Sequence, residues 1–216
     1  MLNRSFLLRF ISGICIISVF VISIRGPSLL FFSLMLVVSI FMIKEWFFIT
    51  YPNIYDIIIG STVIFFSILS LVIVKLFSAR VDILLWYFVV IWTFDTMAMV
   101  GGKFIGGKKI AEKISPMKTW SGALSGVVFA SIASSLICNF LDLTLNSQFS
   151  IFKYGDIFAC ILVCIFAHLG DFFESYYKRK HNVKDSGKII PGHGGVLDRF
   201  DSLIFSAPLL FMMMKF

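Results

Sequence analysis

The sequence predicts an all-α fold, a polytopic bundle of about seven transmembrane helices. Of the 216 residues, 59% are hydrophobic and 14% are charged, whereas a soluble domain has roughly 25% charged residues. The mean hydropathy is +0.96. The apolar residues gather into runs of about 20, the length with which an α-helix crosses a bilayer. Lipid must cover most of the surface, so a soluble fold is excluded.

Seven apolar segments are candidate spans, and short turns or basic loops separate them. They are 6–24, 28–50, 57–77, 83–100, 120–140, 157–173 and 202–216. The first has Arg4 before it and Arg9 near its start, as a signal peptide would, but no small-x-small cleavage site comes after it, so we expect a retained helix. The last is short for a span and contains Pro208.

Lysine and arginine gather on one side of this bundle. With a cytoplasmic N-terminus, fourteen of the nineteen are cytoplasmic, including those of two basic loops, 101–119 and 177–201. Because cytoplasmic loops of membrane proteins carry the excess of positive charge, we expect this orientation. The sequence therefore predicts a multi-pass protein of the cell (inner) membrane with its active site facing the cytoplasm. Its net charge of +7 suits membrane lipids and phosphates, and we expect no nucleic-acid partner.

Three regions follow from this reading of the chain. Residues 1–100 hold N-terminal transmembrane helices, 101–119 form a cytoplasmic basic loop, and 120–216 form a C-terminal transmembrane catalytic region with the cytoplasmic loop 177–201. Gly122 and Gly126 form a G-x-x-x-G pattern, so either a homodimer or a pair of helices within the chain can meet there. We interpret the four cysteines, all within predicted spans, as packing residues: Cys15, Cys138, Cys160 and Cys164.

Two aspartates lie inside predicted spans, about one turn from their cytoplasmic ends. They are Asp95 and Asp171. Charges within spans are costly and often mark function. They either reach water at the interface or face a polar cavity that binds a cation. Nearby His168 is better explained by packing.

The segment after the sixth span favours the second reading. Asp198 and Asp201 are three residues apart, so they share one face of a helix, and with Asp171 they supply three oxygen ligands suited to Mg²⁺. Basic residues that can neutralise a polyphosphate surround them: Lys178, Arg179, Lys184, Lys188 and Arg199. Three glycines would let backbone N–H groups approach phosphate oxygens: Gly192, Gly194 and Gly195. This combination is typical of phosphoryl or nucleotidyl transfer.

These residues carry a resemblance to a known family. The run 175–201 resembles the C-terminal pattern of the phosphatidate cytidylyltransferases (CDP-diacylglycerol synthases), S-x-apolar-K-R-x4-K-D-x-small-x2-apolar-P-x-H-G-G-apolar-x-D-R-apolar-D, with Tyr177 as a mild departure. The stretch 115–122 is similar to the family's S-P-K-K-T-W-E-G, but Met117 and Ser121 depart from it. Lys44-Glu45-Trp46 is similar to a looser family feature.

The resemblance implies a reaction between CTP and phosphatidic acid that yields CDP-diacylglycerol and pyrophosphate, with Mg²⁺ as cofactor. It implies metal ligation by Asp171, Asp198 and Asp201. It implies catalytic roles for Asp171, Lys184, Asp185, His193, Asp198 and Arg199, although His193 is as well explained by a structural role in its turn. It implies substrate contacts from Asp95, Ser115, Lys118, Thr119, Ser175, Lys178, Arg179, Gly194 and Gly195.

Two alternatives use the same residues differently. A CTP-dependent lipid (polyprenol) kinase would phosphorylate an alcohol and release CDP. A non-enzymatic anion transporter would need no reaction, but transporters place ionisable groups near the bilayer midplane, and here they gather at one face. A CDP-alcohol phosphatidyltransferase is disfavoured because its D-x2-D-G-x2-A-R run is absent.

Overall fold

The computed structural model describes residues 4–77, 82–145, 156–187, 189–190 and 194–214. The predicted all-α class is confirmed, with one small hairpin added. The elements are α1 (Arg4–Arg25), α2 (Ser28–Thr50), α3 (Ile54–Phe77), α4 (Asp82–Phe104), β1 (Lys109–Ala111), β2 (Ser115–Thr119), α5 (Trp120–Leu145), α6 (Asp156–Lys180), α7 (Leu197–Phe200) and α8 (Leu203–Met213). The strands pair antiparallel, with Lys109 opposite Thr119 and Ala111 opposite Ser115.

Among the described residues, five helical segments are long and apolar enough to cross a membrane: α2, α3, α4, α6 and Trp120–Phe140 of α5. A shorter apolar stretch, Ile11–Arg25, lies within α1. The segment expected to be a seventh span folds as α8, whose 11 residues extend over about 16 Å, roughly half of the hydrocarbon thickness. The chain is therefore a membrane protein, but the expected number of about seven spans is not confirmed.

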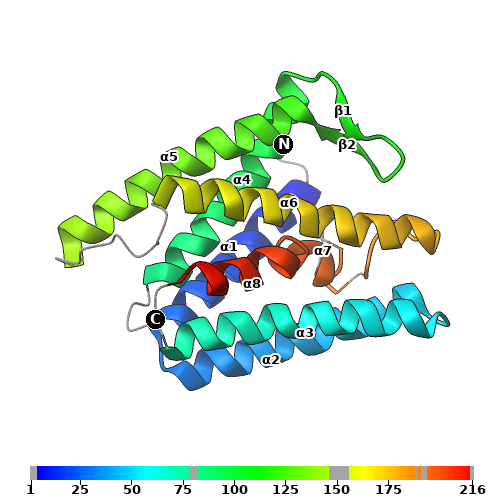
Figure 1. Ribbon diagram of the computed structural model, residues 1–216, viewed down its shortest axis with the longest axis horizontal. Coiled ribbons are helices and arrows are strands. Elements are labelled where there is room, and N and C mark those ends of the chain that lie inside the picture. Colours follow the sequence, from blue (N-terminus) through cyan, green and yellow to red (C-terminus); the bar gives the residue numbers. More distant parts are fainter. Residues whose placement is uncertain (1–3, 78–81, 146–155, 188, 191–193, 215–216) are drawn as a thin grey trace.

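Helix α8 is short because it lies inside the protein. It runs through the middle of the bundle, between α6 and α3 (Figure 1), and packs against both. Pro208 has no N–H to donate to the carbonyl of Ile204, and the hydroxyl of Ser67 on α3 donates to that carbonyl instead. The hydroxyls of Tyr87 and Ser206 are hydrogen-bonded at 2.7 Å. Neighbouring helices thus supply hydrogen-bond partners for polar groups of α8, which lipid could not supply.

Glycines bring α4 and α5 into close contact. A Cβ on Gly122 would lie 2.5 Å from the carbonyl oxygen of Ala98 and 3.1 Å from the backbone of Gly102. A Cβ on Gly126 would lie 2.8 Å from the ring of Phe94. The G-x-x-x-G face therefore packs within the chain, and it gives no support to a homodimer through this face.

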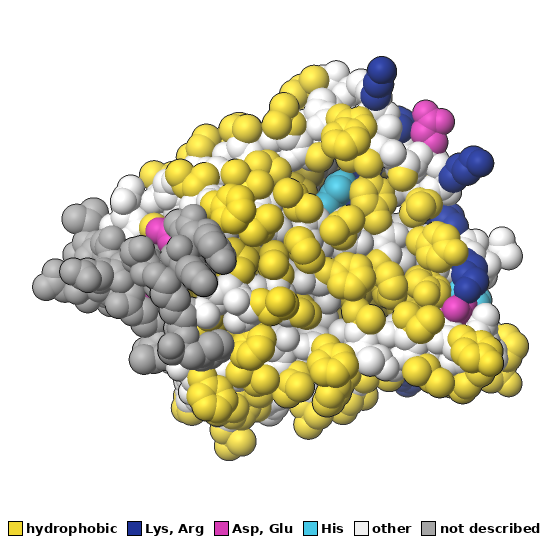
Figure 2. Space-filling model, viewed as in Figure 1, with side chains coloured by type: hydrophobic (Ala, Val, Ile, Leu, Met, Phe, Trp, Pro, Cys, Tyr) yellow, Lys and Arg dark blue, Asp and Glu magenta, His cyan; other side chains and the backbone are white. Residues whose placement is uncertain are grey.

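Charged side chains gather at one end of the bundle. Figure 2 shows lysines and arginines over the end where Figure 1 places the β1–β2 hairpin and the last turns of α6, while hydrophobic side chains cover the long face. At this end Asp56 of α3 is buried and pairs with Lys180 at 2.6 Å and with His181 at 2.8 Å. These ion pairs tie the end of α6, and the loop that follows it, to α3.

Candidate active site

A cavity of about 600 Å³ opens at the charged end of the bundle. Its wall combines one face each of α4 and α6 with the hairpin and with α7, so segments distant in sequence meet there. The lining residues are Phe94, Asp95, Ala98, Met99, Gly102, Lys103, Lys109, Ser115, Met117, Lys118, Thr119, Ala123, His168, Asp171, Lys178, Asp185, Asp198, Arg199 and Asp201. Carboxylates and cations therefore face one another across a single space.

Most residues singled out in the sequence line this cavity. These are Asp95, Ser115, Lys118, Thr119, Asp171, Lys178, Asp185, Asp198, Arg199 and Asp201. Ser175, Arg179, Lys184, Gly194 and Gly195 are not part of its lining. Arg179 instead donates to the carbonyl of Ile114 on the hairpin at 3.3 Å. His193, Gly192 and Lys188 lie outside the described residues.

Asp171 is held by a cation from the hairpin. Its carboxylate forms an ion pair with Lys118, whose ammonium also lies 4.7 Å from the centre of the Phe172 ring. The Ser175 hydroxyl, one helical turn further along α6, lies 3.4 Å from the same carboxylate. Thr119 caps the N-terminus of α5, because its hydroxyl accepts a hydrogen bond from the N–H of Gly122. Lys118 is thus anchored at the junction of hairpin and helix.

Asp198 is the most heavily hydrogen-bonded carboxylate of the site. It accepts from Lys178 at 2.8 Å and from the N–H groups of Gly195 at 2.9 Å and Ser186 at 3.0 Å. Burial would raise the pKa of the Asp198 carboxyl, but the bonds from Lys178 and the two N–H groups together hold that pKa below its ordinary value. Lys178 also pairs with the fully buried Glu174 at 3.0 Å. Asp198 is therefore ionised and fixed in position.

Asp201 has a different environment. Burial raises the pKa of its carboxyl well above the ordinary value, and the nearby carboxylates of Asp171 and Glu174 raise it further. Asp95 adds to the same negative charge. Like charges crowded in a partly buried site are the arrangement that a bound cation relieves.

A divalent cation fits these residues only together with a substrate. In the part of the chain that the structure describes, no three Asp, Glu, His or Cys side chains form a ready-made metal site. Asp171 is paired with Lys118 and Asp198 with Lys178. Mg²⁺ is commonly held by one or two carboxylates plus substrate phosphates, however, and Asp171 and Asp201 supply carboxylates in one cavity.

Of the three loop glycines singled out in the sequence, the structure describes Gly194 and Gly195, and both lie close to carboxylates. Gly194 has a φ of +86°, a conformation that side chains disfavour, and a Cβ there would lie 2.8 Å from Asp198. The N–H of Gly195 already donates to Asp198. Gly194 therefore leaves room for the Asp198 carboxylate, and Gly195 binds it through its backbone N–H.

Comparisons with known proteins show the family of this chain. The model of the cytidylyltransferase family matches residues 53–216, about three quarters of the chain. The chain belongs to this family. The phosphatidate cytidylyltransferase of Rickettsia prowazekii (strain Madrid E) is 44% identical to it over 97% of this chain and 92% of that protein. The enzyme of that name from Rickettsia felis (strain ATCC VR-1525 / URRWXCal2) is 45% identical over 97% and 92%. The phosphatidate cytidylyltransferase of Staphylococcus haemolyticus (strain JCSC1435) is 42% identical over 59% of this chain and 46% of that protein.

The two departures from the family pattern at 115–122 have separate surroundings. Met117 is 78% exposed at the cavity edge. The Ser121 hydroxyl contacts the Thr119 hydroxyl at 3.0 Å and donates to the carbonyl of Gly106. Ser121 therefore holds the turn that leads into the hairpin.

Sequence reasoning missed several residues of the site. Lys103 and Lys109 line the cavity, although in the sequence these two lysines of the loop 101–119 indicated the orientation of the chain and neither was assigned to the site. His168 also lines it, and its Nε2 is buried with no hydrogen-bond partner within the described residues. Side chains of neighbouring residues in a strand point to opposite sides, which could have distinguished Lys109 from Lys108. Strand β1 has only three residues, however, too few for this alternation to be recognised in the sequence.

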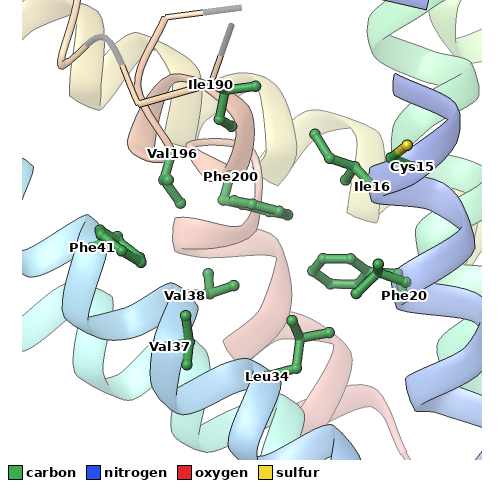
Figure 3. A pocket seen from close by; sticks show the side chains of 11 residues that line it. Cys15, Ile16, Phe20, Leu34, Val37, Val38, Phe41, Ile190, Val196 and Phe200 are labelled. Carbon is green, nitrogen blue, oxygen red and sulfur yellow. The ribbon is translucent and has the colours of Figure 1, made fainter. Parts of the chain in front are cut away.

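A second cavity, of about 260 Å³, is lined by hydrophobic side chains of α1, α2 and the segment around α7 (Figure 3). Phe20, Val38 and Phe200 point into it (Figure 3). Among the described residues that line it, none carries a charge or a hydroxyl group, whereas the larger cavity has both.

Proposed function

We infer that this chain is a phosphatidate cytidylyltransferase, which joins CTP to phosphatidate and yields CDP-diacylglycerol and pyrophosphate. The observation that carries this is the single cavity in which Lys103, Lys109, Lys118 and Arg199 face a group of aspartates at the end of membrane-crossing helices. The phosphatidate cytidylyltransferases that match the chain over nearly its whole length support the same reaction.

The reaction is a displacement at phosphorus. A phosphate oxygen of phosphatidate forms a bond to the α-phosphorus of CTP, and the bond from that phosphorus to the β-phosphate oxygen breaks, which releases pyrophosphate. Because the attacking phosphate is already anionic, no strong general base is needed. We propose that the cations of the cavity hold the two polyanions together and stabilise the charge that moves to pyrophosphate.

Individual side chains take separate parts in this proposal. Lys118 lies next to Asp171, so it is placed to contact a substrate phosphate that binds beside this carboxylate. Arg199 can bind phosphate oxygens with two parallel N–H groups, which a lysine cannot do. Lys178 is 11% exposed and lies between Glu174 and Asp198, so we assign it to positioning Asp198.

We propose Mg²⁺ as the cofactor, with Asp171 and Asp201 as its protein ligands and Asp198 as the third candidate ligand. When bound, the ion neutralises phosphate charge and withdraws electrons from the reacting phosphorus. The crowding of carboxylates around Asp201 supports this choice.

The location of the cavity supports access from a membrane. It lies at the end of the helices where the basic residues gather, and we propose that this end faces the cytoplasm, where CTP is available. The apolar wall formed by Phe94, Ala98 and Met99 would keep water from one side of the reacting phosphates.

The test is release of pyrophosphate from CTP by the purified protein in lipid nanodiscs. We expect release that depends on both phosphatidate and Mg²⁺. Diacylglycerol or a polyprenol in place of phosphatidate should give no product, and formation of CDP from such an alcohol would instead indicate the kinase. Lack of any phosphatidate-dependent pyrophosphate would contradict the proposed function.

A further inference from the structure

Glu45 is a buried carboxylate of α2 that binds the segment carrying Asp198, about 150 residues further along the chain. Its side chain accepts hydrogen bonds from the N–H of Val196 at 3.0 Å, the N–H of Leu197 at 2.8 Å and the hydroxyl of Ser186 at 2.9 Å. Glu45 is 3% exposed. Burying a carboxylate is costly unless hydrogen bonds compensate it, and here three donors from one segment do so.

The same segment connects Glu45 to Asp198 through Ser186. The Ser186 hydroxyl donates to Glu45, while the Ser186 N–H donates to the Asp198 carboxylate at 3.0 Å. The backbone N–H of Asp198 lies 3.3 Å from the Ser186 hydroxyl. A displacement of the Glu45 carboxylate would therefore move both the backbone and the carboxylate partner of Asp198.

Two glycines of the C-terminal motif make room for this carboxylate. A Cβ on Gly187 would lie 2.5 Å from Glu45 Oε1, and one on Gly195 would lie 2.5 Å from Oε2. Both approaches are closer than real side chains allow. The small residues at 187 and 195 are thus explained by a buried glutamate rather than by a phosphate.

We propose that Glu45 is a positioning residue for the transfer reaction, which fixes Asp198 at the cavity through Ser186 and the start of α7. This rests on the proposed function. Glu45 does not line the cavity, so its effect passes through Asp198 and not through substrate. Because small misplacements of a reacting group cost large factors in rate, loss of Glu45 should lower kcat far more than it changes KM.

The variants Glu45→Gln and Ser186→Ala test this in nanodiscs, with Lys44→Gln as a control on an exposed neighbour. In Glu45 one carboxylate oxygen accepts from Val196 and the other from Leu197. In glutamine one of these two oxygens is replaced by an NH₂ group, which donates and cannot accept. We expect kcat per folded molecule to fall about tenfold or more in Glu45→Gln, with KM for CTP and phosphatidate changed less than about threefold. Lys44→Gln should keep the wild-type kcat.

A double variant separates positioning from plain stabilisation. If both residues act through Asp198, the rate effects of Glu45→Gln and Ser186→Ala should combine to less than their product. A lower unfolding midpoint with wild-type kcat in the folded fraction, or fully multiplicative rate effects, would overturn the proposal. Should Glu45→Gln fail to fold, a wild-type kcat in Ser186→Ala would overturn it.

The wild-type protein distinguishes this inference from the proposed function. Active wild-type enzyme with unaffected variants would overturn the role of Glu45 alone. Wild-type protein without phosphatidate-dependent pyrophosphate release would overturn the proposed function and the role of Glu45 with it.

Discussion

Each aspartate of the site is distinguished by what already binds it. Asp198 accepts three hydrogen bonds and has a lowered pKa, whereas Asp201 lies among other carboxylates and has a raised one. Burial by itself would raise both. The difference lies in the N–H groups and Lys178, which donate to Asp198 and lower its pKa, whereas the neighbours of Asp201 are carboxylates that raise its pKa.

Asp171→Asn and Asp198→Asn should each lower turnover by about a hundredfold or more while the protein remains folded. Each change keeps the shape of the side chain but removes a charge that we assign to the metal site or its support. The measurement is pyrophosphate release at saturating Mg²⁺. Glu112→Gln, an exposed carboxyl of the hairpin turn outside the cavity, is the matched control and should keep activity. Near-normal turnover in either aspartate variant would contradict the assignment.

Lys109 and Lys108 form a second matched pair. Both are exposed and adjacent, but only Lys109 is in the cavity lining. We expect Lys109→Ala to raise KM for CTP about fivefold to fiftyfold, the loss of a charge-assisted contact to phosphate. Lys108→Ala should have a small effect that disappears at high salt, because exposed charges are screened. Equal effects of the two changes across a salt series would indicate a diffuse field and no specific contact.

At the scale of helices, glycines bring α4 and α5 into close contact. Both helices carry cavity residues near this contact, Asp95 to Lys103 on one and Ala123 on the other. The glycines let the backbones approach, and this sets the width of the cavity between α4 and the hairpin that leads into α5.

Gly122→Ala should therefore destabilise the protein by about 1–3 kcal/mol, the usual cost of overpacking. Its Cβ would press on the Ala98 carbonyl oxygen. Gly13→Ala on α1, where a Cβ would meet nothing within 4 Å, is the control and should be neutral or slightly stabilising. Thermal unfolding in detergent gives both values. Equal unfolding temperatures for Gly122→Ala and wild type would contradict the close packing of α4 against α5 at this glycine.

Sequence patterns predicted these elements unevenly. Helices α2 to α6 follow from apolar runs between turn residues, because every residue of such a run is compatible with lipid. The same reasoning made 202–216 a span, since apolar residues do not tell whether lipid or protein covers them. The internal position of α8 depends on partners such as Ser67, and no local pattern of the segment encodes them.

The site shows the same division. Asp171 and Asp198 were predictable as cavity residues because the chemistry of phosphate transfer limits which residue types can occur together, whereas Lys118 was singled out by the resemblance of 115–122 to the family pattern. Glu45 was visible as a carboxylate in a predicted span and as part of a looser family feature, but its partners are 141 to 152 positions away. The role that we propose for Glu45 depends on the packing of α2 against the C-terminal loop, and no local sequence pattern predicts that contact.

For the whole molecule, charge is segregated along the long axis of the bundle. At the opposite end, two cations of the described residues contact the protein: Lys75 donates to the carbonyl of Ile24 at 2.5 Å, and Arg25 lies 4.0 Å from Asp82. The end that holds the cavity presents exposed lysines, among them Lys108 and Lys184. Under the positive-inside rule, this asymmetry supports our proposal that the cavity faces the cytoplasm.

Single cysteines at positions 108, 184 and 28 can test the orientation. Ser28 begins α2 at the opposite end of the bundle and is exposed, so it serves as the control. Of the native cysteines, Cys15 is exposed and the other three are buried, so Cys15→Ser provides the background. In sealed cells, a membrane-impermeant maleimide should label Ser28→Cys but neither Lys108→Cys nor Lys184→Cys until the cells are opened. Labelling of positions 108 and 184 from outside would invert the topology and place the cavity away from cytoplasmic CTP. The proposed reaction would then lack its nucleotide, so this single measurement bears on orientation and function together.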